Sequence, residues 1–473
     1  MLLSKLSNII NIQKTYNLNK NNFFSSITSN SKYTNKKTIL IYDKNSKAKY
    51  KYIKDAVKNK TPAIITNKYF KFISIPQFIV SNINKETEIL LKNLYKKTPY
   101  RTIAITGTNG KTSVVWYISK ILNLLNINNT TVGTLGHIRN GKKKNEVNLT
   151  TPAYEELFKY GSSYKKNKYI YIFEASSHAL DQNRIRNYPV NIAAITNISS
   201  DHLDYHKKIS EYKKAKMKLF TKHLDNNSFA VINSRIKNTL NIKKKLTKKR
   251  IKVIYFGKNN VFFEKENDSI SLKINKKKYI VNKLRLNTDI ELENLECAIS
   301  CCLALNINEK KIIKTLSKIT NPPGRLQKIN LDKHKSKIII DYAHTPDALK
   351  KTLKSFKLKN KKPILLFGCG GERDKVKRKS MGIIANKFAL RTYITDDNPR
   401  NENASDIRRA ILKYCPNGIE IANRKQAIKK AIKDLELNEI LIIAGKGHEK
   451  FQIIKNKKIK FDDYKIVKNI IKE

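Results

Sequence analysis

The chain has 473 residues, 40% of them hydrophobic, and a formal net charge of +59. This length predicts about three domains with packed cores and argues against wholesale disorder. Because no run of about 18 or more uncharged apolar residues occurs, the sequence predicts no membrane span.

The charge and the cysteines narrow the function classes. Lysine is spread along the whole chain and far outnumbers arginine. The runs Lys243–Lys245 and Lys276–Lys278 carry no interleaved aromatic side chains, on which single strands stack. We therefore expect no nucleic-acid partner, and a basic nucleic-acid-binding protein with a decayed nucleotide loop stays as the alternative from another class. The cysteines form no zinc spacing and no even disulfide set, and the opening segment lacks a signal peptide. Both features favour a reducing cytoplasm.

The first segment contains short apolar runs at Thr38–Tyr42 and Ala63–Thr66. These runs predict a small α/β domain over residues 1–98. A polar helical stretch, Glu86–Lys97, leads to Pro99, where we place a boundary.

From Thr102 the pattern sharpens. A buried strand is predicted at Thr102–Thr106, followed by a glycine-rich turn and a helix over Thr112–Leu125. Further buried strands at Tyr169–Phe173 and Asn191–Ile195 complete the core of a central domain, placed at 99–330. Together with the sequence Gly107-Thr-Asn-Gly-Lys-Thr112 in that turn, this organisation predicts a P-loop-type ATPase domain with a mostly parallel sheet.

Beyond residue 330, predicted strands alternate with helical stretches. This alternation predicts an α/β, Rossmann-like, doubly wound domain at 331–473, with ligands at the carboxyl ends of its strands. The strands are expected at Lys337–Ile340, Pro363–Phe367, Thr392–Thr395, Ile419–Ala422 and Glu439–Ala444.

The turn after the first central strand reads Thr106-Gly-Thr-Asn-Gly-Lys-Thr112, with Ile105 where the longer phosphate-loop signature has glycine. Backbone N–H groups here can hold phosphate, Lys111 can offset phosphate charge, and the Thr112 hydroxyl can ligate Mg²⁺. A surface turn with a chance lysine is the plain alternative. The strand–loop–helix context favours an ATP loop, which consists of Gly107, Thr108, Asn109, Gly110, Lys111, Thr112 and Ser113.

This short loop and the motifs after it resemble the Mur ligase and folylpolyglutamate synthase superfamily. The matching motifs run in order from about residue 100 to the end, whereas the first domain matches loosely. They are Thr150-Thr-Pro152, Glu174-Ala-Ser-Ser-His-Ala-Leu180, Thr196–His206, Pro323-Gly-Arg325, Asp341–Pro346, Gly368–Asp374, Asp397-Asn-Pro-Arg400 and Gly445-Lys-Gly-His-Glu449.

The resemblance implies an ATP-dependent amide-bond ligase that activates a carboxylate as an acyl phosphate, which an amine then attacks. Within the Mur family, it implies addition of meso-diaminopimelate to UDP-N-acetylmuramoyl-L-alanyl-D-glutamate in peptidoglycan synthesis. The partners are then small molecules, and a monomer is expected.

The expected catalytic residues are Lys111, Glu174, His202 and Lys216. Glu174 and Thr112 offer the hard oxygen atoms that Mg²⁺ prefers. The resemblance assigns Glu174 and His202 to a second Mg²⁺ and places Lys216 where such ligases carry a carbamylated lysine, an anion that can bind the metal. The plain alternatives are a capping histidine and a solvated lysine-rich helix over Tyr212–Phe220.

The resemblance also assigns contacts to two of the substrates. The UDP-muramoyl dipeptide is expected at Thr150, Thr151, Ser176, Gln182 and Arg184. ATP is expected also at Asn294, Arg325 and Asp341; of the family's usual motif before this point, only the final Asn294 is kept. In the first domain, the family's uridine-binding Asp-Ser-Arg is replaced around Ser29-Asn-Ser-Lys32.

The segment Asp397–Arg400 discriminates between amino-acid substrates. Arg400 can hold the distal carboxylate of diaminopimelate with its planar fork, while Asp397 and Glu449 can pair with the distal ammonium. The resemblance adds Asn398, Gly445 and Arg373 to this pocket. A β-turn at Asn-Pro is the plain alternative. A folylpolyglutamate synthase-like ligase should lack this segment and Gly445–Glu449, and a lysine-adding Mur ligase should lack the arginine.

Overall fold

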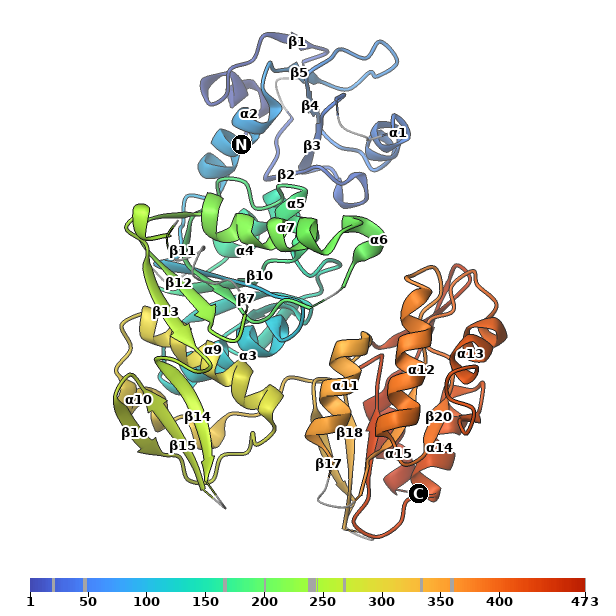
Figure 1. Ribbon diagram of the computed structural model, residues 1–473. Helices are drawn as coiled ribbons and strands as arrows, with labels where there is room; N and C mark the ends of the chain where they lie inside the picture. The colour runs from blue at the N-terminus through green and yellow to red at the C-terminus, as the bar shows by residue number, and fades with distance from the viewer. Residues whose placement is uncertain are drawn as a thin grey trace.

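A computed structural model describes residues 1–18, 22–45, 49–164, 168–199, 201–236, 244, 246–266, 269–331, 335–357 and 361–472. The strands form three large sheets and a hairpin, arranged as three bodies one after another along the chain (Figure 1). The predicted α/β class with mostly parallel sheets is confirmed. Within the described residues, no helix is long and apolar enough to cross a membrane.

The first sheet has the strand order β1-β5-β4-β3-β2, parallel except for β1. Its strands are β1 Lys14–Tyr16, β2 Ser26–Thr28, β3 Thr38–Tyr42, β4 Ile64–Thr66 and β5 Gln77–Ile79. Helices α1 (Lys51–Lys58) and α2 (Ile83–Leu94) pack against it. Helix α2 starts earlier than predicted because the Asn82 side chain caps it by accepting from Lys85 N–H.

The central sheet has the order β16-β15-β14-β13-β12-β11-β6-β10-β7-β8-β9. Its middle strands are parallel, whereas β8, β9, β15 and β16 are antiparallel additions that the sequence pattern did not predict. The strands are β6 Arg101–Thr106, β7 Asn129–Gly133, β8 Gly136–Arg139, β9 Lys142–Asn145, β10 Ile170–Glu174, β11 Val190–Ile195, β12 Leu224–Asn233, β13 Lys252–Phe256, β14 Val261–Glu266, β15 Ser269–Ile274 and β16 Lys277–Ile280.

Helices cover both faces of the central sheet because successive side chains of each strand point to opposite faces. Ile103 and Ile105 of β6 pack with α3 and α9, whereas Ala104 packs with α4 and α7. The helices of this body are α3 Lys111–Leu124, α4 Tyr154–Gly161, α5 Ser177–Asp181, α6 Leu203–His206, α7 Ile209–Lys222, α9 Asp289–Ala304 and α10 Glu309–Ile313.

The third sheet has the order β17-β18-β22-β19-β20-β21, with β17 antiparallel and the rest parallel. All five predicted strands are present. The sheet consists of β17 Gln327–Leu331, β18 Ser336–Ile340, β19 Ile364–Phe367, β20 Thr392–Ile394, β21 Ile419–Glu420 and β22 Ile440–Ile443. A separate hairpin is formed by β23 Phe451–Ile454 and β24 Lys457–Lys460.

Helices also cover both faces of the third sheet, which makes it doubly wound. One core joins α11, α12 and α13 to the face of Ile339 and Leu365, and the other joins α14 and α15 to the face of Ile338 and Leu366. The helices are α11 Pro346–Ser355, α12 Val376–Phe388, α13 Ala404–Leu412, α14 Arg424–Lys433 and α15 Asp463–Lys472.

The bodies are joined differently. One continuous apolar cluster contains Ile39 and Phe78 of the first sheet together with Leu157 of α4. The third body has cores of its own, against which the central body packs Ile290 of α9. The domain limits stay a prediction; β17 crosses the limit at residue 330 because it pairs with β18.

Candidate functional site

The phosphate loop follows β6, and two of its glycines are required by the packing. Gly107 has φ +143°, and a Cβ there would lie 1.8 Å from Thr196 Oγ1. Gly110 has φ +87°, and its Cβ would lie 2.1 Å from Asn294 Oδ1. Both backbones therefore need glycine, and Asn294 of α9 lies directly against the loop.

Two lysines converge on one carbonyl of this loop. Lys111 Nζ donates to Gly107 O and Thr108 O, both at 2.9 Å, and Lys216 Nζ donates to Gly107 O at 2.8 Å. Lys216 is 1% exposed, and its ammonium lies 4.3 Å from the centre of the Tyr212 ring. Burial lowers the pKa of both lysines; that of Lys216 falls well below its ordinary value, and the charge of Lys111 lowers it further. The buried side of α7 thus contradicts a solvated position for Lys216.

Glu174 ends β10 beside the start of α3. The Thr112 hydroxyl donates to its two carboxylate oxygens at 3.1 and 3.0 Å. Thr134 adds its backbone N–H at 2.7 Å and its hydroxyl at 3.2 Å. Glu174 is 1% exposed, and the hydrogen-bond donors that Thr112 and Thr134 offer to its carboxylate are all neutral. Thr134 was not among the predicted residues, although it lies in the glycine-containing turn between β7 and β8.

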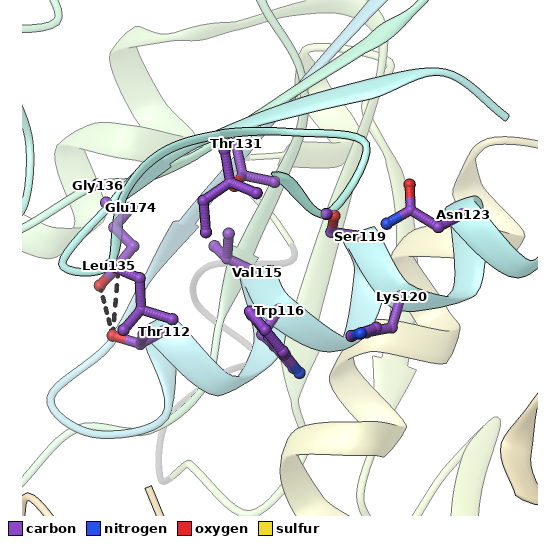
Figure 2. Close-up of a pocket in the computed structure, with 13 residues that line it drawn as sticks. Thr112, Val115, Trp116, Ser119, Lys120, Asn123, Thr131, Leu135, Gly136 and Glu174 are labelled. Atoms are coloured by element: carbon purple, nitrogen blue, oxygen red, sulfur yellow. Dashed lines mark hydrogen bonds between the residues drawn. The ribbon is translucent and has the colours of Figure 1, made fainter. Parts of the chain in front are cut away.

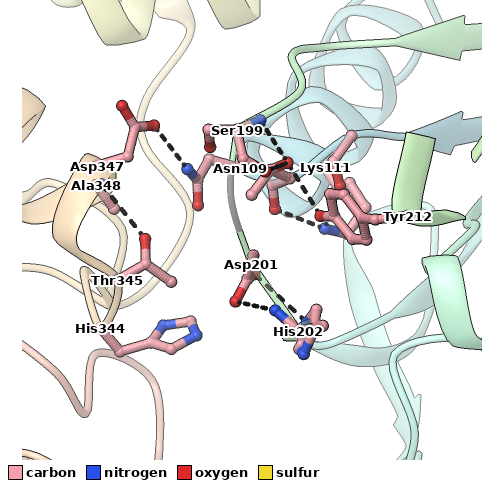
Figure 3. A network of polar contacts seen from close by, with 12 residues as sticks. Asn109, Lys111, Ser199, Asp201, His202, Tyr212, His344, Thr345, Asp347 and Ala348 are labelled. Carbon is pink, nitrogen blue, oxygen red and sulfur yellow. Dashed lines mark hydrogen bonds and ion pairs between the residues drawn. The ribbon is translucent and has the colours of Figure 1, made fainter. Parts of the chain in front are cut away.

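His202 lies on the segment after β11, with a positive φ of +54°. Its Nε2 is 3.4 Å from Asp201 Oδ2, and its ring centre is 4.8 Å from that of His178. His344 of the third body lies across from Asp201 and His202 (Figure 3). Within the described ranges, no group of three His, Cys, Asp or Glu side chains is placed to hold a metal ion. Of the four predicted metal ligands, Thr112 and Glu174 contact each other, while Lys216 and His202 come from separate elements.

The three further residues predicted to bind nucleotide line one pocket between the central and third bodies. Asn294, Arg325 and Asp341 line it together with Asn109, Gly110 and Ser113 of the phosphate loop. The loop and the third body touch directly, because Asn109 Nδ2 donates to Asp347 Oδ2 at 3.3 Å (Figure 3). The predicted nucleotide residues from both bodies are therefore brought together.

Arg325 and Asp341 are held in different ways within this pocket. The Arg325 guanidinium stacks 4.3 Å from the centre of the Tyr342 ring, and its Nη2 donates to Thr112 Oγ1 at 3.4 Å. Asp341 accepts from Leu326 N–H at 3.2 Å and from the Thr352 hydroxyl at 3.0 Å. Burial raises the pKa of Asp341.

The residues predicted for the UDP-muramoyl dipeptide are brought together in part. Thr151 donates its hydroxyl to Glu174 O at 2.8 Å and accepts from Ser176 N–H at 2.9 Å, and Arg184 Nη1 donates to Thr151 O at 2.6 Å. Arg184 Nε is buried and has no hydrogen-bond partner among the described residues. Thr150 has only a 3.5 Å contact with Thr134, and Gln182 is exposed.

The residues predicted to bind the amino acid lie close together where β20 and β22 end. Arg400 has φ +53°, and its Nη1 donates to Gly371 O at 2.7 Å. Asn398 Nδ2 donates to Glu449 Oε2 at 2.9 Å. A Cβ on Gly445 would lie 2.8 Å from Asp397 Oδ2, so the glycine lets the carboxylate approach the loop. These five residues share one site, and Arg373 lies exposed beside it.

A buried lysine among these residues was missed by the sequence analysis. Lys446 has no exposed surface, and its Nζ donates to Asn398 Oδ1 at 3.0 Å and to Glu449 Oε2 at 3.3 Å. The Gly445–Glu449 motif contains this lysine, but a lysine between two glycines gives no signal that it points inward.

A second pocket lies behind the phosphate loop, between α3 and the β7–β8 turn. Figure 2 shows Thr112 and Glu174 at one end of it, with Val115, Trp116 and Leu135 along its wall. The hydroxyl–carboxylate contact of the predicted metal site therefore forms the inner end of a mostly apolar space.

Comparisons with known proteins place the chain among ligases. The model of the Mur ligase middle domain matches residues 105–302, and that of the Mur ligase glutamate ligase domain matches residues 324–447. The chain is 39% identical, over 88% of its length and 90% of the relative's, to the UDP-N-acetylmuramoyl-L-alanyl-D-glutamate–2,6-diaminopimelate ligase of Rickettsia bellii. It is 35% identical to the enzyme of the same name from Buchnera aphidicola, over 95% of both chains.

Solved structures agree with these relatives. A structure of a UDP-N-acetylmuramoyl-L-alanyl-D-glutamate–2,6-diaminopimelate ligase superposes with a TM-score of 0.63 at 26% identity, over 95% of both chains. MurF ligase from Thermotoga maritima in complex with ADP gives a TM-score of 0.63 at 15% identity, over 89% of this chain and 93% of the other, and shows the same fold.

Proposed function

This chain belongs to the Mur ligase family, and we propose that it joins meso-diaminopimelate to UDP-N-acetylmuramoyl-L-alanyl-D-glutamate, with ATP as the energy source. The products are the UDP-muramoyl tripeptide, ADP and phosphate, and the reaction is a step of peptidoglycan synthesis. The observation that carries this assignment is that Asp397, Asn398, Arg400 and Glu449 lie together at the ends of β20 and β22.

The first step is phosphorylation of the D-glutamate side-chain carboxylate. A carboxylate oxygen attacks the γ-phosphorus of ATP, the bond to the β-phosphate oxygen breaks, and ADP leaves an acyl phosphate. Lys111 Nζ donates to the loop carbonyls of Gly107 and Thr108. From there its ammonium can offset the negative charge of the phosphoryl group during its transfer. Arg325 and Asp341, on the opposite wall of the pocket, would hold the nucleotide.

The residues at Glu174 fit a divalent cation. The Glu174 carboxylate and the Thr112 hydroxyl are hard oxygen donors in contact with each other, and the carboxylate is buried with no ion pair among the described contacts. Bound there, Mg²⁺ would neutralise phosphoryl oxygens during the transfer. We propose two such ions, with His202 contributing to the second.

An unmodified Lys216 does not fit a cation site, because an ammonium repels a metal ion. Burial lowers the pKa of Lys216, which favours the neutral, nucleophilic amine, and this amine can add CO₂ and lose a proton to give a carbamate. The carbamate would supply anionic oxygens next to Gly107. We therefore propose that Lys216 is carbamylated. Loss of activity when CO₂ is removed, and its return when bicarbonate is added, would support this proposal.

The second step is attack of the diaminopimelate amine on the acyl phosphate, which forms the amide, releases phosphate and frees a proton. The pocket on the third body suits the distal end of this amino acid. Arg400 keeps its Nε and Nη2 free of hydrogen bonds to the described residues, so both can donate to the distal carboxylate. Asp397 and Glu449 would pair with the distal ammonium.

The test is phosphate release from ATP with the UDP-muramoyl dipeptide and, in turn, meso-diaminopimelate, L-lysine or no amino acid. We expect turnover with diaminopimelate and little with the other two. Turnover with L-lysine in place of diaminopimelate would refute the acceptor assignment and leave the ligase chemistry standing. A monomer acting in the cytoplasm belongs to the same proposal, and light scattering of the purified protein tests the monomer.

A further inference from the structure

Lys446 is a buried lysine at a site that is proposed to bind the distal ammonium of diaminopimelate, which is itself a cation. It has no exposed surface, and within the described residues its ammonium has two hydrogen-bond acceptors for three N–H donors. A buried charge with incomplete partners is costly, and an apolar side chain of the same length would fill the space at less cost. Packing alone therefore gives no reason for a lysine at this position.

The contacts of Lys446 form a closed triangle with two pocket residues. Its Nζ donates to Asn398 Oδ1 at 3.0 Å and to Glu449 Oε2 at 3.3 Å, and Asn398 Nδ2 donates to the same Oε2 at 2.9 Å. Asn398 Oδ1 also accepts from Ile453 N–H at 3.0 Å. Because every polar atom of the Asn398 amide is engaged, the amide can take one orientation only.

The triangle leaves one oxygen of Glu449 for a ligand. Its Oε2 receives both donors, whereas Oε1 has no hydrogen-bond partner among the described residues. The Glu449 side chain is 24% exposed, so this oxygen is within reach of solvent and ligand. A carboxylate held at one oxygen and open at the other suits a ligand ammonium.

The start of the loop that carries Lys446 is fixed independently. Arg424 donates to Ala444 O at 3.0 Å and forms an ion pair with Asp463 at 2.8 Å, and neither side chain is exposed. The backbone before Gly445 is therefore anchored. Removing the Lys446 ammonium takes one hydrogen bond from Asn398 and one from Glu449 without releasing the loop.

We propose that Lys446 is a positioning residue for the distal ammonium of the amino-acid substrate. It acts through Asn398 and Glu449 and has no contact with the substrate itself. This inference rests on the proposed function, since it concerns how the diaminopimelate pocket recognises one of its two distal groups.

The experiment compares two acceptors that differ only in the distal ammonium. Meso-diaminopimelate has this group, whereas L-2-aminopimelate keeps the attacking amine and the distal carboxylate and lacks it. In Lys446→Met we expect kcat/KM for diaminopimelate to fall about 10- to 100-fold, the range for a charged hydrogen bond. The value for L-2-aminopimelate should stay within about threefold, as should KM for ATP.

Lys450→Met is the matched control, because Lys450 is exposed and lies four residues further along the same segment. Melting temperatures are measured first, and Lys446→Gln, which keeps an N–H donor without the charge, is compared in the same way if the methionine variant does not fold. An equal fall for both acceptors, or no fall for either, would overturn the inference. A wild-type enzyme that does not turn over diaminopimelate would instead refute the proposed function.

Discussion

The phosphate loop takes its groups from consecutive residues, 106–112, whereas the amino-acid pocket takes its groups from three segments near 371, 397–400 and 445–449. At the loop, Lys111 and the incoming Lys216 of α7 both donate to the backbone carbonyl of Gly107. In the pocket, Lys446, Asn398 and Glu449 hold one another through their side chains. A side-chain change in the loop should therefore alter its chemistry and leave its shape, whereas a change in the pocket should move neighbouring groups as well.

Lys111→Met gives the largest expected effect. The Lys111 ammonium bonds only to Gly107 O and Thr108 O in the described contacts, so its loss should leave the fold intact. Turnover at saturating substrates should fall about 10³-fold, because one preorganised charge at the transferring phosphoryl group is lost. Phosphate release measures the effect. Lys120→Met, on the same helix, is the control, and a fall of similar size there would contradict a specific role for Lys111.

Glu174→Gln should reduce turnover about 10²-fold and raise the Mg²⁺ concentration needed for half-maximal activity, since an amide is a weaker ligand than a carboxylate. The amide has nearly the same shape, so the melting temperature should change little. A Mg²⁺ titration of activity measures the shift. Glu264→Gln changes a surface carboxylate on β14 and should alter neither quantity. Unchanged Mg²⁺ dependence in Glu174→Gln would remove Glu174 from the metal site.

Arg400→Ala should weaken the use of diaminopimelate and leave ATP binding at the phosphate loop unchanged. Arg400 and alanine share the cost of the positive φ, so the change adds no new backbone strain. We expect kcat/KM for diaminopimelate to fall about 10- to 100-fold through loss of a bidentate contact, with KM for ATP nearly unchanged. Initial rates at varied diaminopimelate concentration measure this fall. Arg409→Ala, which changes an exposed arginine on α13, is the control. A parallel rise in KM for ATP would show that the two regions are not independent.

His137→Gln gives the smallest expected effect, a change in the pH dependence of stability, and concerns strand β8 of the central sheet. Burial lowers the pKa of His137 from 6.5 to about 4, and its ring nitrogens contact Thr130 and Asn145. The unfolded chain therefore binds a proton first, so the stability from neutral His137 is present above pH 6.5 and is lost as the pH falls towards 4. At pH 5.5 the loss is about 1.4 kcal/mol.

The variant should therefore lose less stability than the wild type between pH 7.5 and pH 5.5. Urea unfolding followed by the fluorescence of Trp116, the single tryptophan, reports on the central body. Equal losses in the two proteins would show that His137 is not protonated on unfolding in this range.

The sequence predicted β6, β10, β11, the five parallel strands β18–β22 and the loop between β6 and α3, because these depend on local patterns, but it did not predict the parallel strands β7, β12, β13 and β14. Buried strands appear as apolar runs, and the loop has its glycines at fixed spacing. Predicted limits missed by one to three residues where a cap decided them, as Asn82 does for α2. The antiparallel strands β8, β9, β15 and β16 were missed, since β9 and β16 are mostly exposed and polar and give no apolar run.

The sequence by itself determined which residue types carry the chemistry: the loop of Lys111 and Thr112, the acidic end of β10, and the arginine after Asn398. Only the tertiary structure decided that Lys216 faces inward against Gly107, that Thr134 holds Glu174, and that Lys446 lies buried between Asn398 and Glu449. The physical reason is burial. The direction in which a lysine points depends on which acceptors the fold brings within reach, and those acceptors come from segments far apart in the chain.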